Sequence, residues 1–251
     1  MRHPRVFGGL AVILLLVWSG TICAQDTHAS EILAQVANKN RERQAALGAY
    51  RSDRVYCIEY RGVGGLHSAR MDVHAEYRAP GVKHLTVVSE TGSKAFGEKV
   101  LRRLVESEEE SSKAENQVQM MVSPDKYDAQ VVGQEMVRGV NAWMLDVKPK
   151  EPSKFNYNGR IWVSVDDLAI MRVVGHPAKN PSWLVNHTDF DSEYEHIGNF
   201  WLMEKNTTVS HVRVGGEATL TIDYGSYTVE AAPDKVATAH PTSGAPPALR
   251  R

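Results

Sequence analysis

Apolar side chains near the amino end follow the period of a helix. Over residues 30–47, four of them share one face among charged neighbours: Ile32, Leu33, Val36 and Ala37. This spacing predicts an amphipathic helix with a single apolar face. Gly48 follows directly and is expected to end the helix, because glycine is common at helix carboxyl ends.

A second helix is expected over residues 94–113. Phe96, Val100 and Leu104 recur there every four residues, so they share one helix face. The far end of this segment is an acidic run, residues 106–110. Such runs are typical of solvated helix faces, and these carboxylates are therefore expected to face water.

From Tyr50 onward the hydrophobic period changes to two. Apolar and polar residues alternate most clearly over residues 69–77, which predicts a strand with one dry and one wet face. Residues 55–60 and the glycine-rich segment 62–65 precede it, so a hairpin is expected, and the pattern continues over residues 85–89. Later turn signals stand at Gly139, Asp166 and Asp167, Gly198, and Gly215 and Gly216. Short strands joined by tight turns predict an antiparallel meander that runs to residue 230.

The amino end has the three parts of a secretory signal peptide. Arg2 and Arg5 precede an apolar run over residues 10–18, and uncharged residues then lead to Ala24. Cleavage after Ala24 is expected, which makes residues 1–24 a signal peptide. The run is too short to span a bilayer, which takes about 20 apolar residues. The alternative is a lipoprotein acylated at Cys23 and anchored to a membrane.

Residues 231–251 are rich in Ala, Pro, Thr, Ser and Gly, which predicts a disordered tail. Residues 25–230 are then expected to form a single β-rich domain, large enough to be held together by its core. Cleavage leaves Cys57 without a cysteine partner, and its alternating apolar surroundings predict a buried thiol. Without Arg2 and Arg5, 27 basic residues remain, fewer than the 30 acidic ones, so the net charge is negative. The sequence also has no basic stripe, and both features argue against nucleic acid as a partner.

Candidate chemistry is sparse. Acidic residues spaced by two lie between two histidines: His187, Asp189, Asp191, Glu193, Glu195 and His196. Tyr194 stands where a calcium loop of the EF-hand type needs glycine, and the alternation with Phe190 favours a solvent-facing strand side. No zinc-binding helix motif, hydrolase elbow or phosphate-binding loop is present. We expect no catalytic residue, no metal site and no cofactor.

Large flexible or aromatic apolar residues are more prominent than any catalytic motif. They include Met120, Met121, Met136, Trp143, Met144, Trp162, Met171, Trp183, Trp201 and Met203. Methionine adapts to varied apolar shapes and tryptophan forms large rigid walls. Two interpretations stay open, the lining of a ligand cavity and an ordinary packed core.

Residues 127–227 resemble the periplasmic outer-membrane lipoprotein-sorting proteins, carriers related to the Lol lipoprotein chaperone. Three segments carry the resemblance. Residues 137–150 form a strand pair ending in Pro149 and Lys150, residues 159–172 form a hairpin with Trp162, and residues 198–202 precede the closing strand 218–224. These are sheet and turn signatures, so they support a fold more strongly than a ligand.

The resemblance implies an α+β fold of mostly antiparallel strands, an incomplete curved β-barrel with an α-helical lid. Family carriers hold acyl chains between sheet and lid. The residues expected to face such a ligand here are Met71 and Val73 on a strand, with Ile32, Val36, Phe96 and Val100 on the two helices. An arginine tethers the lid in such carriers; Arg54 and Arg70 are candidates, and each is by default a surface charge.

The expected function is that of a monomeric periplasmic carrier for lipoproteins or other acylated, apolar ligands, active in outer-membrane lipoprotein sorting. Such a carrier is not an enzyme, and membrane-bound donor and acceptor proteins are its expected partners. One alternative is an envelope regulatory sensor of the same fold that binds a protein. Another is a hydrolase that uses the segment 187–196.

Overall fold

A computed structural model describes residues 21–180 and 182–233 of the chain. Its helical segments are α1 (Thr21–Ala46), α2 (Lys94–Phe96), the π-helical turn η1 (Gly97–Leu101), α3 (Arg102–Ser111) and α4 (Ala114–Met120). Its strands are β1 (Leu47–Gly62), β2 (Gly65–Arg78), β3 (Val82–Gly92), β4 (Tyr127–Val137), β5 (Val140–Pro149), β6 (Tyr157–Ser164), β7 (Ile170–Pro177), β8 (Val185–Ile197), β9 (Phe200–Val212) and β10 (Gly216–Ala231).

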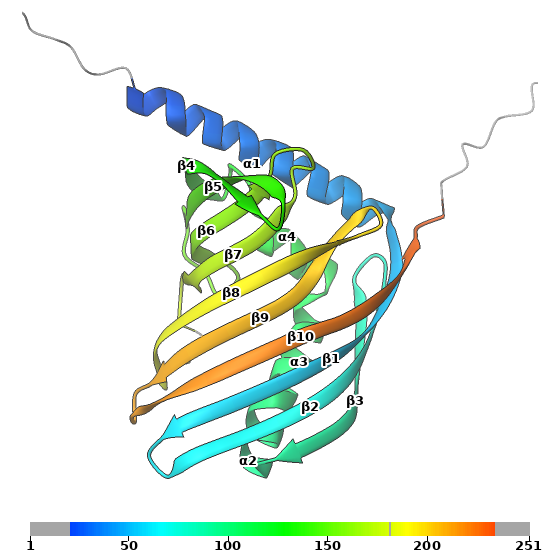
Figure 1. Cartoon of the computed structure of the whole chain (residues 1–251), viewed down its shortest axis with the longest axis vertical. Helices are drawn as coiled ribbons and strands as arrows, with labels where there is room; N and C mark the ends of the chain where they lie inside the picture. Colours follow the sequence, from blue (N-terminus) through cyan, green and yellow to red (C-terminus); the bar gives the residue numbers. More distant parts are fainter. Residues whose placement is uncertain (1–20, 181, 234–251) are drawn as a thin grey trace, which may run out of the picture.

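All these strands belong to one antiparallel sheet, in the order β3-β2-β1-β10-β9-β8-β7-β6-β5-β4. Most neighbours are consecutive hairpins, as the turn signals predicted. The exception is β1, which pairs with β10, so that Tyr50 lies opposite Val229. Strands β3 and β4 form the two edges, and the curved sheet stays unclosed between them (Figure 1). The expected fold class, an incomplete curved barrel with helices on one side, is confirmed.

Helix α1 packs on the half of the sheet formed by β4 to β7. Its buried face consists of Ala29, Ile32, Leu33, Val36 and Ala37, each at most 4% exposed. Leu145, Ile161 and Val163 of the sheet are fully buried in the same cluster. Burying a large aliphatic side chain contributes about 1.5–3 kcal/mol, so this contact fixes α1 firmly on the sheet.

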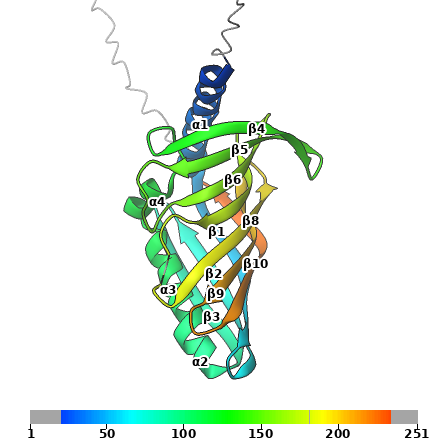
Figure 2. The same cartoon turned by 90° about the vertical axis from the view of Figure 1, so that its left-hand side faces the viewer.

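The remaining helical segments share one face of the sheet, beside β1 to β3 (Figure 2). They are α2, η1, α3 and α4. Leu101 and Val105 are buried against a cluster that includes Tyr56, Met71 and Val73. The helix expected over residues 94–113 is therefore present, but its middle is a π-helical turn. Its apolar face is what holds it to the sheet.

Two local expectations were wrong. Gly48 lies within β1 and does not cap α1; a Cβ there would lie 2.7 Å from the carbonyl oxygen of Ala231, so glycine allows β1 and β10 to approach closely. Cys57 is half-buried and not buried, because it lies on the opposite side of β1 from Tyr56 and Ile58.

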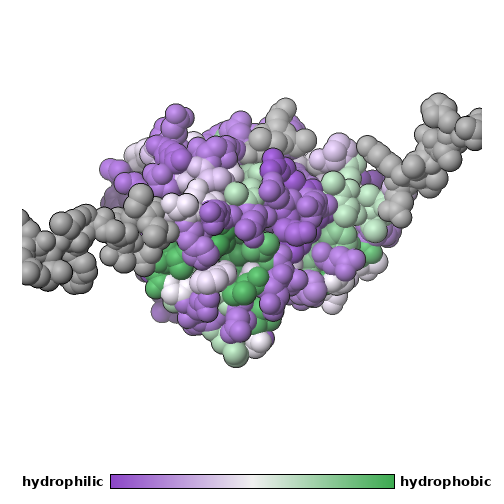
Figure 3. All heavy atoms as spheres, turned by 90° about the horizontal axis from the view of Figure 1, so that it is seen from above, coloured by the Kyte–Doolittle hydropathy of each residue, from purple (hydrophilic) through white to green (hydrophobic). Residues whose placement is uncertain are grey.

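The expected signal peptide falls on residues 1–20, outside the described residues, and on the first residues of α1. Most of the expected tail, residues 234–251, is likewise outside them, while Ala231 still belongs to β10. Within residues 21–180 and 182–233, no helix combines the length and the apolar character needed to cross a membrane. On the face seen from above, hydrophilic residues predominate, and apolar residues gather in small areas between them (Figure 3).

Candidate functional site

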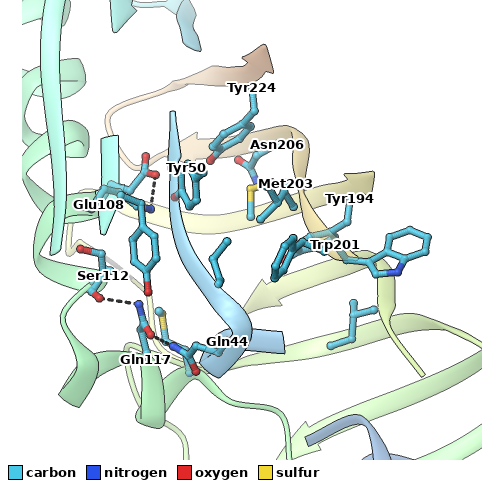
Figure 4. A pocket seen from close by; sticks show the side chains of 18 of the residues that line it. Gln44, Tyr50, Glu108, Ser112, Gln117, Tyr194, Trp201, Met203, Asn206 and Tyr224 are labelled. Atoms are coloured by element: carbon cyan, nitrogen blue, oxygen red, sulfur yellow. Dashed lines mark hydrogen bonds and ion pairs between the residues drawn. The ribbon is translucent and has the colours of Figure 1, made fainter. Parts of the chain in front are cut away.

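A cavity of about 680 Å³ lies between the helices and the sheet (Figure 4). Its walls come from the carboxyl end of α1, from α3 and α4, and from strands β1, β2, β3, β7, β8, β9 and β10. Cavities for small molecules span roughly 300–1,000 Å³. The helix–sheet cavity, as it is named below, therefore has the size of a ligand site.

Most of its lining is apolar or aromatic. These side chains are Leu47, Tyr50, Tyr56, Tyr77, Leu104, Met120, Met121, Ile170, Tyr194, Phe200, Trp201, Leu202, Met203, Ile222 and Tyr224. The polar lining consists of Asn40, Arg43, Gln44, Lys83, Ser107, Glu108, Ser111, Ser112, Gln117 and Asn206. Large rigid rings with interspersed methionine suit an apolar ligand of variable shape.

A buried charge cluster joins α3 to the sheet at one wall of this cavity. The guanidinium of Arg54 on β1 donates to the Glu108 carboxylate on α3, and the Arg54 side chain is only 1% exposed. The Lys83 ammonium donates to the same carboxylate oxygen as Arg54, at 3.0 Å, and the Tyr56 hydroxyl donates to the other oxygen at 2.5 Å. The Arg54 guanidinium also lies 4.6 Å from the centre of the Tyr224 ring. Because each charge has partners, the cluster can persist in a largely apolar wall.

The cluster keeps Glu108 ionised. Burial alone raises the pKa of this carboxyl, but the charges of Lys83 and Arg54 and the hydrogen bond from Tyr56 outweigh it and lower the pKa to about 2. Burial and the charge of Glu108 raise the pKa of Tyr56. A general acid or base works best with a pKa near the operating pH, so these groups are poised to hold α3 in place and not to transfer protons.

A second, polar contact links α1 and α4 across the cavity. The Gln44 amide donates to Gln117, and the Gln117 amide donates to the Ser112 carbonyl at 2.6 Å (Figure 4). Nearby, the Arg43 guanidinium donates to the carbonyl of Asp167. Exposed amide contacts contribute little to stability, so this side of the cavity is held more weakly than the wall at Glu108.

The six residues expected to face a ligand separate into two clusters. Ile32 and Val36 pack under α1 with Leu145 and Ile161. Met71 and Val73 pack under η1 and α3, together with Phe96 and Val100. None of the six lines the helix–sheet cavity, whereas Met120, Met121, Trp201 and Met203 from the methionine and tryptophan set do.

Of the two tether candidates, Arg54 is buried and bound to the helix, so its default assignment as a surface charge was wrong. Arg70 is half-exposed and pairs with Asp72 at 2.7 Å on the same strand. Its default assignment holds.

The expectation of a fully solvated acidic run was also wrong, because Glu108 enters the buried cluster and Glu109 accepts the Leu85 amide at 2.6 Å. Two patterns in the sequence indicate that Arg54 and Glu108 are buried. Arg54 has the same parity as buried Tyr56 and Ile58 on β1, and Glu108 follows Leu104 by four residues, on the helix face turned toward the sheet.

Three of the four acidic residues of β8, Asp189, Asp191 and Glu193, are paired with a cation or with histidine. His187 contacts Asp189 at 2.9 Å, and Arg172 donates two hydrogen bonds to Asp191. Glu193 pairs with Arg138 at the tip of the β4–β5 hairpin. Among the residues that the structure describes, no three His, Cys, Asp or Glu side chains gather as a metal site.

No protein-family model matches the chain, and a search of curated proteins gave no match. Solved structures do match. One is a DUF1329 family protein from Desulfovibrio piger, with 16% identity and a TM-score of 0.44 over 80% of this chain and 93% of that one. Another is a candidate outer membrane lipoprotein-sorting protein domain from Vibrio parahaemolyticus, with 10% identity and a TM-score of 0.40 over 84% and 95%.

A third is a LolA superfamily protein from Nitrosomonas europaea, with 9% identity and a TM-score of 0.35 over 83% of this chain and 96% of that one. Lipoprotein-sorting proteins are thus among the structures that the chain matches. At these identities and TM-scores the matches carry no argument about a ligand.

Proposed function

We propose that this protein is a periplasmic carrier that binds one acylated or otherwise apolar ligand in the helix–sheet cavity, by burial alone. The cavity itself carries the proposal: about 680 Å³ between helices and sheet, with a lining that is mostly aromatic and aliphatic. The ligand class includes lipoprotein acyl chains and free lipids. Both present flexible hydrocarbon, which a lining rich in methionine and tyrosine can accommodate.

The physical need for such a carrier is large. Each methylene exposed to water costs about 0.8 kcal/mol, so acyl chains do not cross an aqueous compartment unshielded. Membrane-bound donor and acceptor proteins then load and unload the carrier. The charge cluster supports this cycle, because Glu108 fixes α3 through ionic contacts that can break and reform, whereas α1 is sealed by apolar packing.

Native mass spectrometry tests the proposal. The protein is purified from a periplasmic extract without detergent, and the bound molecules are extracted and identified. Mass in excess of the chain, in the form of acyl-containing species, is the expected result. A fluorescent fatty acid then measures the affinity of the emptied protein.

A matched pair of variants assigns the site. Met121→Trp fills part of the cavity and is expected to weaken binding of the fluorescent fatty acid by about tenfold, because the probe loses its space. Met136→Trp makes the same change at a site 65% exposed on the β4–β5 hairpin and is expected to bind normally. Equal affinities for both variants, or a chain that binds no acyl species, contradict the proposal and favour a sensor that binds a protein.

A further inference from the structure

Three turns meet at the end of the sheet where β1 and β9 finish. The β1–β2 and β9–β10 turns are adjacent, since Gly62 pairs with Gly216 and a Cβ on Gly215 would lie 3.7 Å from Val63. The β7–β8 loop joins them, because the amide of Arg213 donates to the carbonyl of Leu184 at 2.8 Å. In Figure 1 these turns follow one another along the left-hand edge. They are named the turn end below.

Large apolar side chains are exposed on all three turns. They are Val63 at 76%, Leu66 at 63%, Trp183 at 78%, Leu184 at 41% and Val214 at 67%. Exposed single residues of this kind are ordinary, but their gathering on adjacent turns is not. Trp183, which is this exposed, lacks the stabilisation that burial would give it, and for so large a side chain that free energy is several times the value for one methyl group.

Hydrogen bonds are formed by residues on both sides of Trp183. The amide of Leu184 donates to the Ser182 hydroxyl at 3.2 Å, and the Asn180 side chain donates to the Asn186 carbonyl at 3.1 Å. The chain therefore presents Trp183 to solvent on a built turn. Backbone that is already held by hydrogen bonds loses little conformational entropy when it docks.

The charge of the turn end is basic although the whole chain carries a formal net charge of −1. Arg61, Lys179 and Arg213 are exposed on or beside the three turns. The acidic residues beside them are Glu217, which lies opposite Arg61 in the strand register and 3.7 Å from His211, and the exposed Glu59. Apolar tips, a tryptophan and a basic rim together match the interfacial region of an anionic bilayer.

We infer that the turn end docks the protein on anionic phospholipid bilayers, with Trp183 and Val214 entering the interface and the three basic residues contacting lipid phosphates. The helix–sheet cavity is lined instead by the opposite ends of these strands, at Leu47 on β1 and Phe200 on β9. Docking thus leaves the cavity free to meet a protein partner. The inference does not depend on what the cavity binds.

Vesicle co-sedimentation tests the docking. Mass spectrometry first verifies that the protein used lacks the apolar run 10–18, which could itself bind lipid. This protein is then mixed with vesicles of phosphatidylglycerol and phosphatidylcholine, or of phosphatidylcholine alone. Binding to the anionic vesicles is expected, with about fivefold loss in 0.5 M salt because the basic rim is screened. Absence of binding, or equal binding to both vesicles, overturns the inference.

Two double variants locate the contact. Trp183→Ser with Val214→Ser is expected to weaken binding by about tenfold, because the apolar groups no longer enter the interface. Val88→Ser with Met136→Ser removes side chains that are 69% and 65% exposed away from the turn end, and it is expected to bind like the parent chain. Equal losses in both variants overturn the assignment; circular dichroism verifies that each is folded. Fatty-acid binding in the cavity is expected to be unchanged in all of them, which separates this test from that of the carrier function.

Discussion

The two halves of the sheet are covered by helices in different ways. Over β4 to β7, α1 forms an apolar contact in which Leu33 and Val36 are completely buried, and the Arg43 guanidinium near its carboxyl end donates to the carbonyl of Asp167. Over β1 to β3, α3 is held by Leu101 and Val105 together with the pairing of Glu108 and Arg54. The helix–sheet cavity lies beside this second contact.

From this difference we expect α1 to be a fixed cover of the sheet and α3 with α4 to be a cover that can open. Water cannot replace the apolar contacts along a helix as long as α1. We therefore expect α1 to stay on the sheet while the protein is folded. Breaking the buried pair of Glu108 and Arg54 is costly, but α4, which follows α3, is tied to α1 through the amides of Gln44 and Gln117, which can exchange their partners for water. For the carrier function proposed above, we therefore expect the ligand to enter between α1 and α4, on the α3 side of the cavity.

The largest effect is expected from breaking the ionic anchor. Glu108→Ala leaves Arg54 buried without its carboxylate partner, and we expect a loss of about 4 kcal/mol in the free energy of unfolding. Urea unfolding followed by circular dichroism measures it. The control is Glu110→Ala, whose carboxylate pairs with Lys113 in an exposed position and is expected to change stability by less than about 0.5 kcal/mol.

A double variant shows whether the anchor acts as a pair. Arg54→Met with Glu108→Leu removes both charges, and it is expected to be more stable than Glu108→Ala alone, because no unpaired charge stays buried. Similar stabilities for the double and the single variant would mean that the two charges do not interact.

Truncating the apolar contact of α1 is expected to cost somewhat less. Leu33→Ala creates a cavity in a fully packed cluster and should lower the free energy of unfolding by about 3 kcal/mol. Fatty-acid affinity should not change, because Leu33 does not line the cavity. An affinity loss as large as that of Met121→Trp would refute the distinction between the two halves.

Acid should loosen the α3 side selectively. The pKa of Glu108 is lowered from an ordinary value of 4.5 to about 2, so its ionisation stabilises the fold above pH 4.5 and this stabilisation is lost as the pH falls toward 2. By pH 3 the loss is about 2 kcal/mol. Urea unfolding at pH 6 and pH 3 measures the change. The stability difference between the parent chain and Glu108→Gln should shrink by this amount, and a constant difference would contradict the assigned role.

The smallest effect concerns an ion pair on the sheet surface. Arg160 donates two hydrogen bonds to Asp146, at 2.6 and 3.0 Å, but both side chains are more than 40% exposed. Asp146→Asn should therefore lower the free energy of unfolding by about 0.5 kcal/mol. A loss comparable to that of Glu108→Ala would show that burial does not distinguish the two pairs.

Local patterns in the sequence were sufficient to predict much of this fold. The alternation over residues 69–77 and the turn at 62–65 predicted the β1–β2 hairpin, since both depend on neighbouring residues. The spacing of Ile32, Leu33, Val36 and Ala37 predicted the buried face of α1. Pairing of β1 with β10 was not predictable in this way, because it joins residues that are far apart in the sequence, such as Tyr50 and Val229.

The cavity was harder to predict than the strands. The six residues expected to face a ligand were selected as apolar side chains on the right elements, and such residues pack against each other first. The lining instead comes from strand ends and helix ends far apart in the chain, such as Tyr50, Met121 and Tyr224. Only the topology brings them together.

Hydrogen exchange with and without a bound fatty acid tests the central claim most directly. The ligand is expected to slow exchange in α3, in α4 and in the segments of β1 and β9 that line the cavity, while amides over residues 29–37 of α1 stay unchanged. Protection confined to α1, or equal protection of both helices, would contradict the assignment of ligand binding to the α3 side.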